Sequence, residues 1–348
     1  MQRITIGPDY EISRVIRGGW QLAGGHGDID ADTAVDDMIA FADAGITTFD
    51  CADIYTGVEE LIGRFRLAYK NLRGAEALAR IRVHTKFVPD LAVLPVISKA
   101  YVEGVIDTSR QRLNLDCLDL VQFHWWAYDI PGWLETAGWL NELHQQGKIG
   151  KISGTNFDTD HIEAIVGSGV PFTSLQLQYS LLDRRPEKRM AALAAEKNFA
   201  LFCYGTVAGG FLGDRWLGRS EPDHPLENRS LTKYKLIIDD FGGWDLFQAL
   251  LSTLRTIADR HQVDIATVAS AAMLTRPGVA AVIVGARNRD HLPSNLAIAD
   301  ITLTDADLGE MDAILSQAHP LEGDVYTLER DREGRHGSIM KYNLNKGE

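Results

Sequence analysis

Residues 48–63 have the sequence TFDCADIYTGVEELIG, which passes from a strand through a short loop into a helix. The apolar run Ile46–Phe49 predicts a buried strand, and the pattern of Glu59–Ile62 predicts the start of a helix. Asp50 therefore stands at the end of a strand, and Tyr55 stands in the loop that follows. This carboxylate and this phenol become a reactive pair only if other strands bring a cation and an imidazole to the same place.

The order of apolar run, polar loop and helical stretch repeats along the chain, which predicts βαβ units and a parallel sheet. Strands that are each followed by a helix close naturally into a (β/α)8 TIM barrel, and no GxGxxG follows the first strand. An open doubly wound sheet is the alternative. The expected strands are Arg14–Gly18, Ile46–Asp50, Arg82–Lys86, Leu118–His124, Ile149–Gly154, Ser174–Leu177, Ala200–Cys203 and Val279–Val284. The helices are expected to begin near Asp32, Val58, Leu94, Gly132, Thr159, Arg185, Asp245 and Asp290.

The 348 residues are expected to form one barrel domain, residues 1–348, because α/β barrels use ~250 or more residues as a single unit. Two segments depart from the repeat. The connection after strand seven, residues 205–243, is long and contains Gly, Pro and charged residues, and a second helix over 264–275 precedes the last strand. The charged tail, residues 322–348, is expected either to form a flap over the barrel mouth or to be mobile.

The net charge of −13 and the pI near 5.2 argue against nucleic acid or an anionic membrane as a partner, since both require a basic face. No apolar run reaches the ~18 residues of a membrane helix, and residues 1–10 lack the apolar core of a signal peptide. We therefore expect a cytoplasmic location. The cysteines Cys51, Cys117 and Cys203 are expected to be reduced core thiols.

No metal site is predicted. Asp28, Asp30 and Asp32 alternate as at the start of a calcium loop, but that loop needs Gly and Glu where this chain has Thr33 and Ile39. The aspartates are instead expected to cap the first helix.

The C-terminal ends of barrel strands open on one face, and Asp50, Tyr55, Lys86 and His124 all lie at or just after expected strand ends. A phenol titrates near ~10 and releases its proton more readily beside a cation. Lys86 can be that cation, with Asp50 as its counter-charge, and His124 can donate to a carbonyl oxygen beside the phenol. The set contains an acid and no nucleophile, which indicates that a cofactor supplies hydride. Each residue alone also fits a structural role as a loop cap, a loop aromatic, a solvated charge or a core histidine.

Several ordered motifs accompany these residues. They are FDCADIYTGVEELIG at 49–63, HTKF at 84–87, QFHWW at 122–126, GTNF at 154–157, QLQYSLLDRRPE at 176–187 and VGARNRDHLPSNL at 284–296. On these motifs the chain resembles the aldo-keto reductase family from about Gly18 to Leu296. The resemblance implies the same barrel and a catalytic tetrad of Asp50, Tyr55, Lys86 and His124, with Tyr55 as the general acid.

The resemblance also implies a nicotinamide cofactor, usually NADPH, bound across the barrel mouth. The positions that match its nicotinamide end are Thr155, Asn156, Gln176 and the stacking aromatic Tyr204. The positions that match its diphosphate are Gly205, Val207 and Gly209, where small residues let backbone amides approach an anion. The positions that match its adenosine end are Gly285, Ala286, Arg287, His291 and Asn295. Without the resemblance, Asn156 would be expected to cap the next helix, and Tyr204 would be expected to pack in the core.

Three departures from the family pattern stand out. Gly285 and His291 occupy positions where some branches carry Lys and Arg, so NADH remains possible as the cofactor. Gly19 replaces the Thr of the commoner Gly-Thr-Trp form.

The expected substrate pocket is lined by Trp20, Tyr55, His124 and Trp125, which suits an aldehyde or ketone with an apolar or sugar-like body. Two alternatives remain. One is a regulatory subunit that binds nicotinamide and senses redox state, and the other is a lyase in which Lys86 forms a Schiff base.

Overall fold

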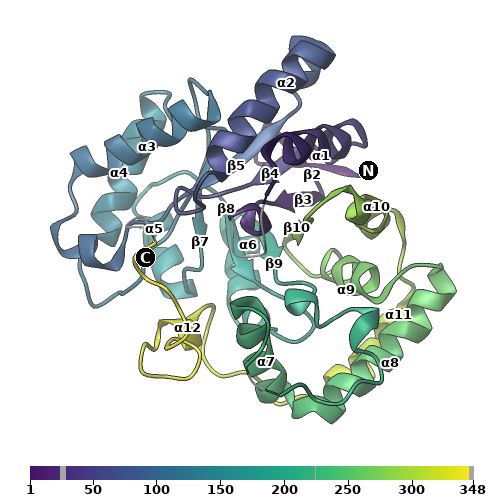
Figure 1. Cartoon of the computed structure of the whole chain (residues 1–348). Coiled ribbons are helices and arrows are strands. Elements are labelled where there is room, and N and C mark those ends of the chain that lie inside the picture. Colours follow the sequence, from purple (N-terminus) through teal and green to yellow (C-terminus); the bar gives the residue numbers. More distant parts are fainter. Residues whose placement is uncertain (24–28, 224, 345–348) are drawn as a thin grey trace.

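A closed parallel barrel lies at the centre of the computed structural model, which describes residues 1–23, 29–223 and 225–344 (Figure 1). Its strands follow one another in chain order around the barrel, and the last closes the ring by pairing with the first. The predicted (β/α)8 fold is therefore confirmed. The barrel strands are β3 (Val15–Gly18), β4 (Thr48–Asp50), β5 (Arg82–Phe87), β6 (Leu120–Phe123), β7 (Ile152–Thr155), β8 (Phe172–Gln178), β9 (Ala200–Tyr204) and β10 (Val279–Gly285).

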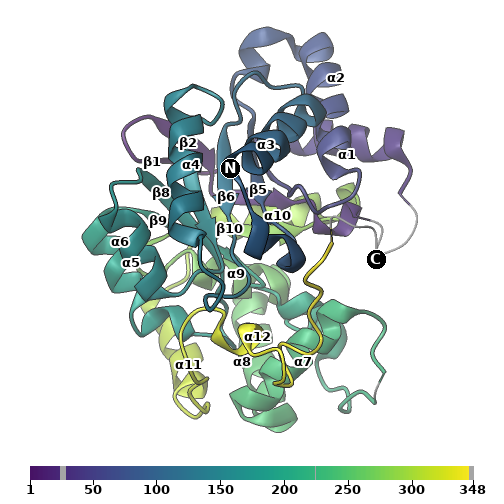
Figure 2. The same cartoon turned by 90° about the vertical axis from the view of Figure 1, so that its left-hand side faces the viewer.

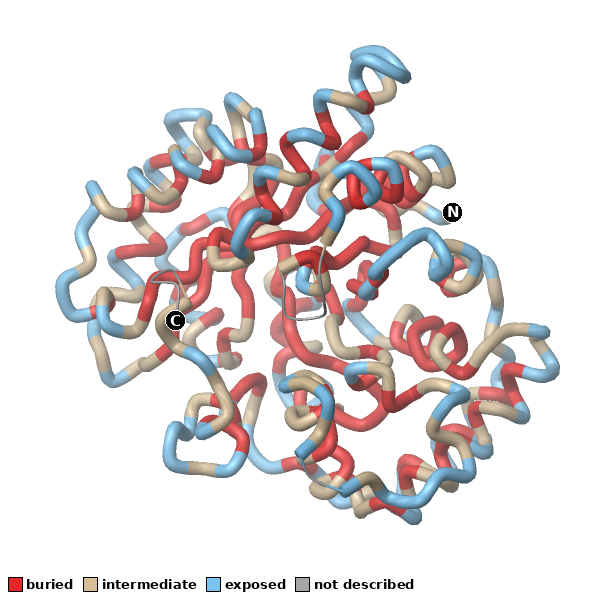
Figure 3. Tube along the Cα trace, in the orientation of Figure 1, coloured by how far each residue is buried: buried red, intermediate tan, exposed pale blue. Residues whose placement is uncertain are grey.

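Helices surround the barrel, and Figure 3 shows buried residues along the strands and on the inner sides of the helices. The first helix begins as predicted, because the carboxylate of Asp30 accepts from the backbone N–H of Thr33. Asp28 lies outside the described residues. The main helices are α1 (Ala31–Asp43), α2 (Val58–Leu78), α3 (Lys99–Leu113), α4 (Trp133–Gln145), α5 (Thr159–Gly167), α6 (Met190–Lys197), α8 (Gly243–His261), α9 (Ile265–Met273), α10 (Leu292–Asp300) and α11 (Asp305–Leu315).

Three helices begin later than predicted, because a 3-10 turn precedes each of them. The first such turn, η2 (Leu91–Val96), contains Pro95, and α3 begins only after the side chain of Ser98 caps it. Proline cannot donate a backbone hydrogen bond and therefore disfavours a continuous helix here. The turns η3 (Arg185–Glu187) and η6 (Arg289–His291) precede α6 and α10 in the same way.

The long connection after β9 contains a helix that was not predicted, α7 (Arg229–Phe241). Its buried positions Leu231, Tyr234, Ile237 and Ile238 follow helical spacing, so the signal was present in the sequence. The helix packs on the turn η4 (Ala208–Gly210) directly after β9.

An N-terminal hairpin of β1 (Arg3–Ile6) and β2 (Tyr10–Ser13), also not predicted, closes one end of the barrel. The ring of Tyr10 lies 5.9 Å from that of His84, and His84 stacks at 5.3 Å on Phe202. These rings belong to the apolar filling at this end. The barrel therefore has room for a reactive polar layer only at the opposite, C-terminal end.

Residues 322–344, here called the C-terminal strap, lie against that opposite end as the yellow segment of Figures 1 and 2. The strap contains one short helix, α12 (Thr327–Arg330). Its carbonyl at Tyr342 accepts from the backbone N–H of Leu91 at 2.8 Å, so the segment reaches the loop after β5. The described part of the tail therefore packs against the barrel and the loop after β5.

Cys51, Cys117 and Cys203 are free thiols, and Cys51 and Cys203 lie in the core as predicted, whereas Cys117 is only partly buried. Across the described ranges, no helix has the length and apolar character needed to cross a membrane. Nor does the described part of the chain contain a group of His, Cys, Asp or Glu side chains that could hold a metal ion.

Candidate active site

Asp50, at the end of β4, is the centre of a buried polar network. Its Oδ2 accepts from Lys86 Nζ at 2.6 Å, and its Oδ1 accepts from the side-chain amides of Gln122 and Gln176 at 2.7 Å each. Lys86 Nζ also donates to the carbonyl of Cys51 at 2.7 Å. The strands β4, β5, β6 and β8 each supply one of these side chains, which meet because their C-terminal ends open on one face.

The phenol ring of Tyr55 lies above Lys86, whose Nζ is 5.0 Å from the ring centroid. Burial opposes the charge of Lys86, but Asp50 and Tyr55 outweigh this effect, so the pKa of Lys86 is raised. Lys86 is therefore an ammonium at neutral pH. Burial also raises the pKa of Tyr55, and Lys86 counteracts only part of this rise. Lys86 thus lowers the pKa of Tyr55, as predicted, but burial raises it by more.

His124 follows β6, and its Nδ1 lies 3.0 Å from the carbonyl oxygen of Thr155. A carbonyl oxygen can only accept, so Nδ1 carries the hydrogen. Burial and the charge of Arg330 lower the pKa of His124 to about 3, which leaves the ring neutral at pH 7. Its Nε2, which has no partner among the described residues, is then an acceptor. With Nδ1 committed to Thr155, the neutral ring has no N–H left for a carbonyl oxygen beside the phenol, which corrects the prediction made for His124.

The structure places Trp125 away from the mouth, contrary to the prediction. Trp125 is 0% exposed and packs edge-on against Phe123 in the layer outside the barrel. Its neighbour Trp126 instead lies 4.3 Å from the ring of His124. β6 ends at Phe123, so His124, Trp125 and Trp126 belong to the loop after the strand, and it is this loop that brings Trp126 against His124.

Trp20 lies where it was predicted, with its ring edge-on to that of Tyr55 at 5.1 Å and 39% of its surface exposed. The preceding Gly19 donates its backbone N–H to the carbonyl of Asp50 at 2.7 Å. A Cβ atom at Gly19 would lie 2.8 Å from that carbonyl oxygen. This close approach explains why the chain has Gly at this position.

Asn156 and Tyr204 lie together at the mouth, where the phenol of Tyr204 donates to Asn156 Oδ1 at 2.9 Å. Asp158 and not Asn156 caps α5, so the alternative of a helix cap is wrong. Thr155 is buried, and its carbonyl oxygen accepts a hydrogen bond from His124 Nδ1. The side-chain amide of Gln176 donates to Asp50 Oδ1.

The glycines after β9 have left-handed backbone conformations, with φ of 76° at Gly205 and 65° at Gly209. The ring of Tyr234 packs against both, and a Cβ atom at Gly205 would lie 2.3 Å from its hydroxyl oxygen. The structure thus supplies a packing reason for these glycines besides the predicted approach of an anion. On the same helix, Lys233 Nζ lies 5.3 Å from the ring centroid of Tyr204.

The loop after β10 presents Arg287 to solvent, and within the described residues Arg287 makes no ion pair or hydrogen bond. Arg289, two positions further on, donates to Asp37 of α1 at 2.9 Å. Arg287 is therefore the free cation of this pair.

The other residues predicted at the adenosine end, which lie in this loop and in α10, differ in exposure. Gly285 and His291 are exposed, while Ala286 and Asn295 are buried. Asn295 Nδ2 has no hydrogen-bond partner in the described part of the chain, so a buried donor remains available there. Gln21 packs against Gly285, and a Cβ atom there would lie 2.2 Å from Gln21 Nε2.

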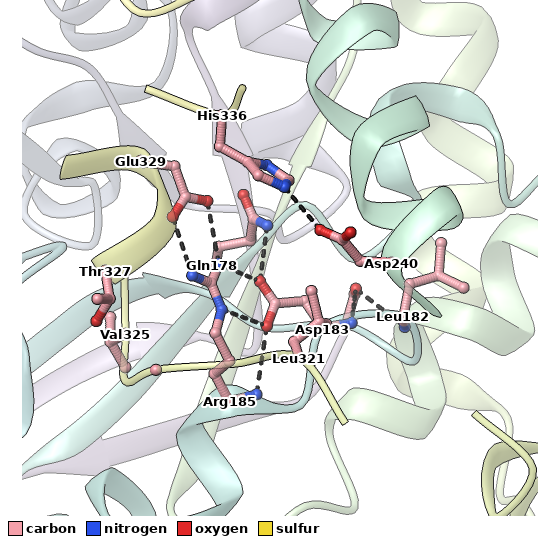
Figure 4. A network of polar contacts seen from close by, with 12 residues as sticks. Gln178, Leu182, Asp183, Arg185, Asp240, Leu321, Val325, Thr327, Glu329 and His336 are labelled. Carbon is pink, nitrogen blue, oxygen red and sulfur yellow. Dashed lines mark hydrogen bonds and ion pairs between the residues drawn. The ribbon is translucent and has the colours of Figure 1, made fainter. Parts of the chain in front are cut away.

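A buried ion-pair cluster holds the C-terminal strap beside this site (Figure 4). The guanidinium of Arg185 donates to both carboxylate oxygens of Glu329 at 3.0 Å and to those of Asp183 at 2.6 and 2.9 Å. A second contact joins His336 of the strap to Asp240 of α7 at 2.7 Å.

Residues 14–316 match the model of the Aldo/keto reductase family. The chain belongs to this family. It is 26% identical to the NADH-specific methylglyoxal reductase of Escherichia coli K12, over 88% of this chain and 96% of that protein. It is 30% identical to an uncharacterized oxidoreductase of Mycobacterium tuberculosis H37Rv, over 84% and 86% of the two chains. Among solved structures, the glycerol dehydrogenase of Gluconobacter oxydans shares the fold with a TM-score of 0.74 at 24% identity, covering 92% of this chain and 97% of that one.

As an aldo-keto reductase, the protein is an NAD(P)H-dependent oxidoreductase that acts on carbonyl compounds. The mouth also contains side chains that the sequence did not predict, namely Gln122, Trp126, Tyr326 and Arg330. Gln122 stands two positions before His124 in the predicted strand, so strand alternation could have revealed it, whereas Trp126 lies in the loop after β6. Tyr326, whose ring lies 5.9 Å from that of His124, and Arg330 come from the strap and had no local signal.

Proposed function

We propose that this aldo-keto reductase reduces a small aldehyde or ketone to the alcohol, with Tyr55 as the proton donor and NADPH as the preferred cofactor. The observation that carries the proposal is the buried ion pair of Asp50 and Lys86 directly beneath the phenol of Tyr55. Trp20 packs edge-on against this phenol, and Nε2 of His124 has no partner among the described residues. This arrangement supports Tyr55 as a general acid held beside a buried cation.

Tyr55 holds its proton until a stronger base forms beside it. Reduction of a carbonyl group creates an alkoxide, which is a stronger base than a phenolate and takes the proton from Tyr55. The ammonium of Lys86 then stabilises the phenolate that remains. Asp50 keeps Lys86 protonated by offsetting the cost of a buried charge.

Nε2 of His124 orients a hydroxyl group by accepting its hydrogen bond, either from Tyr55 or from the substrate. A bare ring nitrogen cannot polarise a carbonyl oxygen, because both are acceptors. Trp126 and Tyr326 limit the rotation of the imidazole by packing edge-on against it.

The residues at the mouth fit a nicotinamide cofactor. The unpartnered amide of Asn295 in α10 and the exposed Arg287 in the loop after β10 offer a buried donor and a free cation. When bound, the cofactor supplies the hydride. We assign its nicotinamide end to Thr155, Asn156, Gln176 and Tyr204, its diphosphate to Gly205, Val207 and Gly209, and its adenosine end to Gly285, Ala286, Arg287, His291 and Asn295.

The alternative of a Schiff-base lyase is disfavoured by the state of Lys86. A Schiff base forms from a neutral amine, whereas Lys86 is ion-paired and its pKa is raised. No observation favours the regulatory subunit over the enzyme.

The experiment follows the absorbance of NADPH and NADH in the presence of a panel of aldehydes and ketones, with wild-type protein and with Tyr55→Phe. We expect wild-type turnover and a loss of ~10²- to 10⁴-fold in Tyr55→Phe, which is the usual contribution of a general acid. Cofactor affinity, measured by fluorescence, should be nearly unchanged. Turnover in Tyr55→Phe above half of wild type would contradict the proposal.

A further inference from the structure

The strap places the guanidinium of Arg330 between the ends of β6 and β7. Arg330 Nη1 donates to the carbonyl oxygens of Trp125 and, at 2.7 Å, of Trp126, while Nη2 donates to that of Asn156 at 2.8 Å. The guanidinium also stacks on Tyr128, with 3.9 Å between its carbon and the ring centroid. Such a set of contacts needs the planar fork of arginine, because a lysine ammonium cannot reach both segments in one plane.

These carbonyls flank the hydrogen bond that orients His124. Trp125 follows His124 in the chain, and Asn156 follows Thr155, whose carbonyl accepts from His124 Nδ1. Arg330 therefore links the two segments that the His124 hydrogen bond joins. It binds the carbonyl of Trp125, the residue after His124, and the carbonyl of Asn156, the residue after Thr155. Asn156 has a left-handed φ of 61°, its N–H donates to the carbonyl of Gln176, and its own carbonyl accepts from Arg330.

The docking of the strap does not depend on Arg330 alone. Glu329 is paired with Arg185, and Asp324 accepts from the backbone N–H of Thr159 at 3.1 Å. Attachment of the strap therefore does not by itself account for the contacts of Arg330.

Resting on the proposed function, we propose that Arg330 is a positioning residue, supplied by the strap, that fixes the tautomer and orientation of the His124 imidazole. The three carbonyls hold the guanidinium, and the guanidinium in turn holds the peptides on both sides of the Nδ1 hydrogen bond. The charge of Arg330 acts in the same direction. After burial, it is the second cause that lowers the pKa of His124 to about 3 and keeps Nε2 free of a proton.

The other side chains around the His124 imidazole are left unchanged by substitutions at Arg330. Tyr326 of the strap, Trp126 and Phe157 pack edge-on against the imidazole, and the latter two carry no charge. Tyr55 and the Asp50–Lys86 pair share the mouth and are not altered.

The test compares Arg330→Met, which removes both charge and fork, with Arg330→Lys, which keeps the charge but loses the fork. Arg332→Met is the matched control, because Arg332 is an exposed arginine of the same strap. The readouts are the pH profile of kcat/KM, the affinity for NADPH and the side-chain nitrogen shifts of His124 in isotope-labelled protein.

We expect Arg330→Met to lower kcat by roughly 10- to 100-fold, since a misplaced catalytic group can cost ~10²-fold. The acid limb of its pH profile should move toward neutral pH by roughly one unit, as expected when a nearby like charge is removed. Arg330→Lys should lose turnover as well but keep the acid limb of wild type. The control should change neither, and cofactor affinity should stay within about threefold for all variants, well under the tenfold that corresponds to 1.4 kcal/mol.

Wild-type nitrogen shifts for His124 together with a wild-type acid limb in Arg330→Met would overturn the inference, as would equal losses in the Arg332→Met control. If Arg330→Met releases the strap, seen as fast hydrogen exchange over residues 322–344, Arg330→Lys decides the matter. The nitrogen shifts also separate the two proposals. Absence of carbonyl turnover in wild type would refute the proposed function. The role of Arg330 would still be supported if the nitrogen shifts show an unprotonated Nε2 in wild type and a different state in Arg330→Met.

Discussion

The carboxylate of Asp50 and the ammonium of Lys86 lie 2.6 Å apart, and only about 5% of each side chain is exposed. Buried pairs of this kind are costly to form, because both ions lose their hydration. Here the additional donors from Gln122 and Gln176 satisfy the second carboxylate oxygen. The pair is therefore fully hydrogen-bonded at Asp50, and its presence at the mouth indicates a chemical role.

Lys86→Met should abolish carbonyl reduction and also destabilise the fold. The substitution leaves Asp50 as an unpaired buried charge, which typically costs ~3–5 kcal/mol of unfolding free energy. The matched control is the double variant Asp50→Asn with Lys86→Met, which removes the unpaired charge. Urea unfolding should show the double variant to be more stable than Lys86→Met alone. A double variant at least as unstable as the single one would mean that the ion pair is not the origin of the loss.

Arg287→Ala should weaken NADPH binding by about 10- to 100-fold and leave NADH nearly unchanged. A charge-assisted hydrogen bond is worth ~1.5–3 kcal/mol, and NADPH differs from NADH by one phosphate. Fluorescence titration of both cofactors measures the effect. Arg289→Ala is the control, because Arg289 is already paired with Asp37. Equal losses for NADPH and NADH in Arg287→Ala would show that Arg287 only shapes the loop.

Gly19→Ala should destabilise the protein by ~1–3 kcal/mol and reduce turnover, because the new methyl group would lie 2.8 Å from the carbonyl oxygen of Asp50. Gly104→Ala in α3 is a matched control, since a Cβ atom there meets nothing within 4 Å. That change should be neutral or stabilising by up to ~1 kcal/mol, as alanine is the better helix former. Thermal unfolding of both variants decides the matter, and equal melting temperatures would contradict the steric argument.

Glu329→Gln should loosen the strap, because it leaves the buried guanidinium of Arg185 with one carboxylate partner fewer. Burial opposes the charge of Glu329, but Arg185 and Lys233 outweigh it and hold its pKa at about 2, below the usual 4.5. A lowered pKa in the folded state stabilises the fold above the unfolded value and is lost as pH falls through the folded value. In wild type, protection of strap amides from hydrogen exchange should thus be constant above pH 5 and fall between 4.5 and 2.

In Glu329→Gln, the protection should be lower at neutral pH and should not show this acid-dependent loss. The same pH dependence in variant and wild type would assign the titration to another group, such as the contact of His336 with Asp240.

The order of strands and loops was predictable because it depends on local patterns. Apolar runs of strand length, each followed by helical spacing, indicated the barrel, and the position of Asp50, Lys86 and His124 at strand ends placed them on one face. The motifs around these residues indicated the family, which the match over residues 14–316 confirms.

The tertiary structure alone decided which way each side chain turns and which distant segments meet. Trp125 and Trp126 are adjacent and chemically alike, yet only the folded loop after β6 shows that Trp126 is the one that packs on His124. The tautomer of His124 depends on the carbonyl of Thr155 from the neighbouring strand, and its neutral state depends on burial and on Arg330, 206 residues further along the chain. Sequence patterns describe contacts between near neighbours, whereas the strap reaches the mouth through buried ion pairs and carbonyl contacts that form only once the barrel is closed.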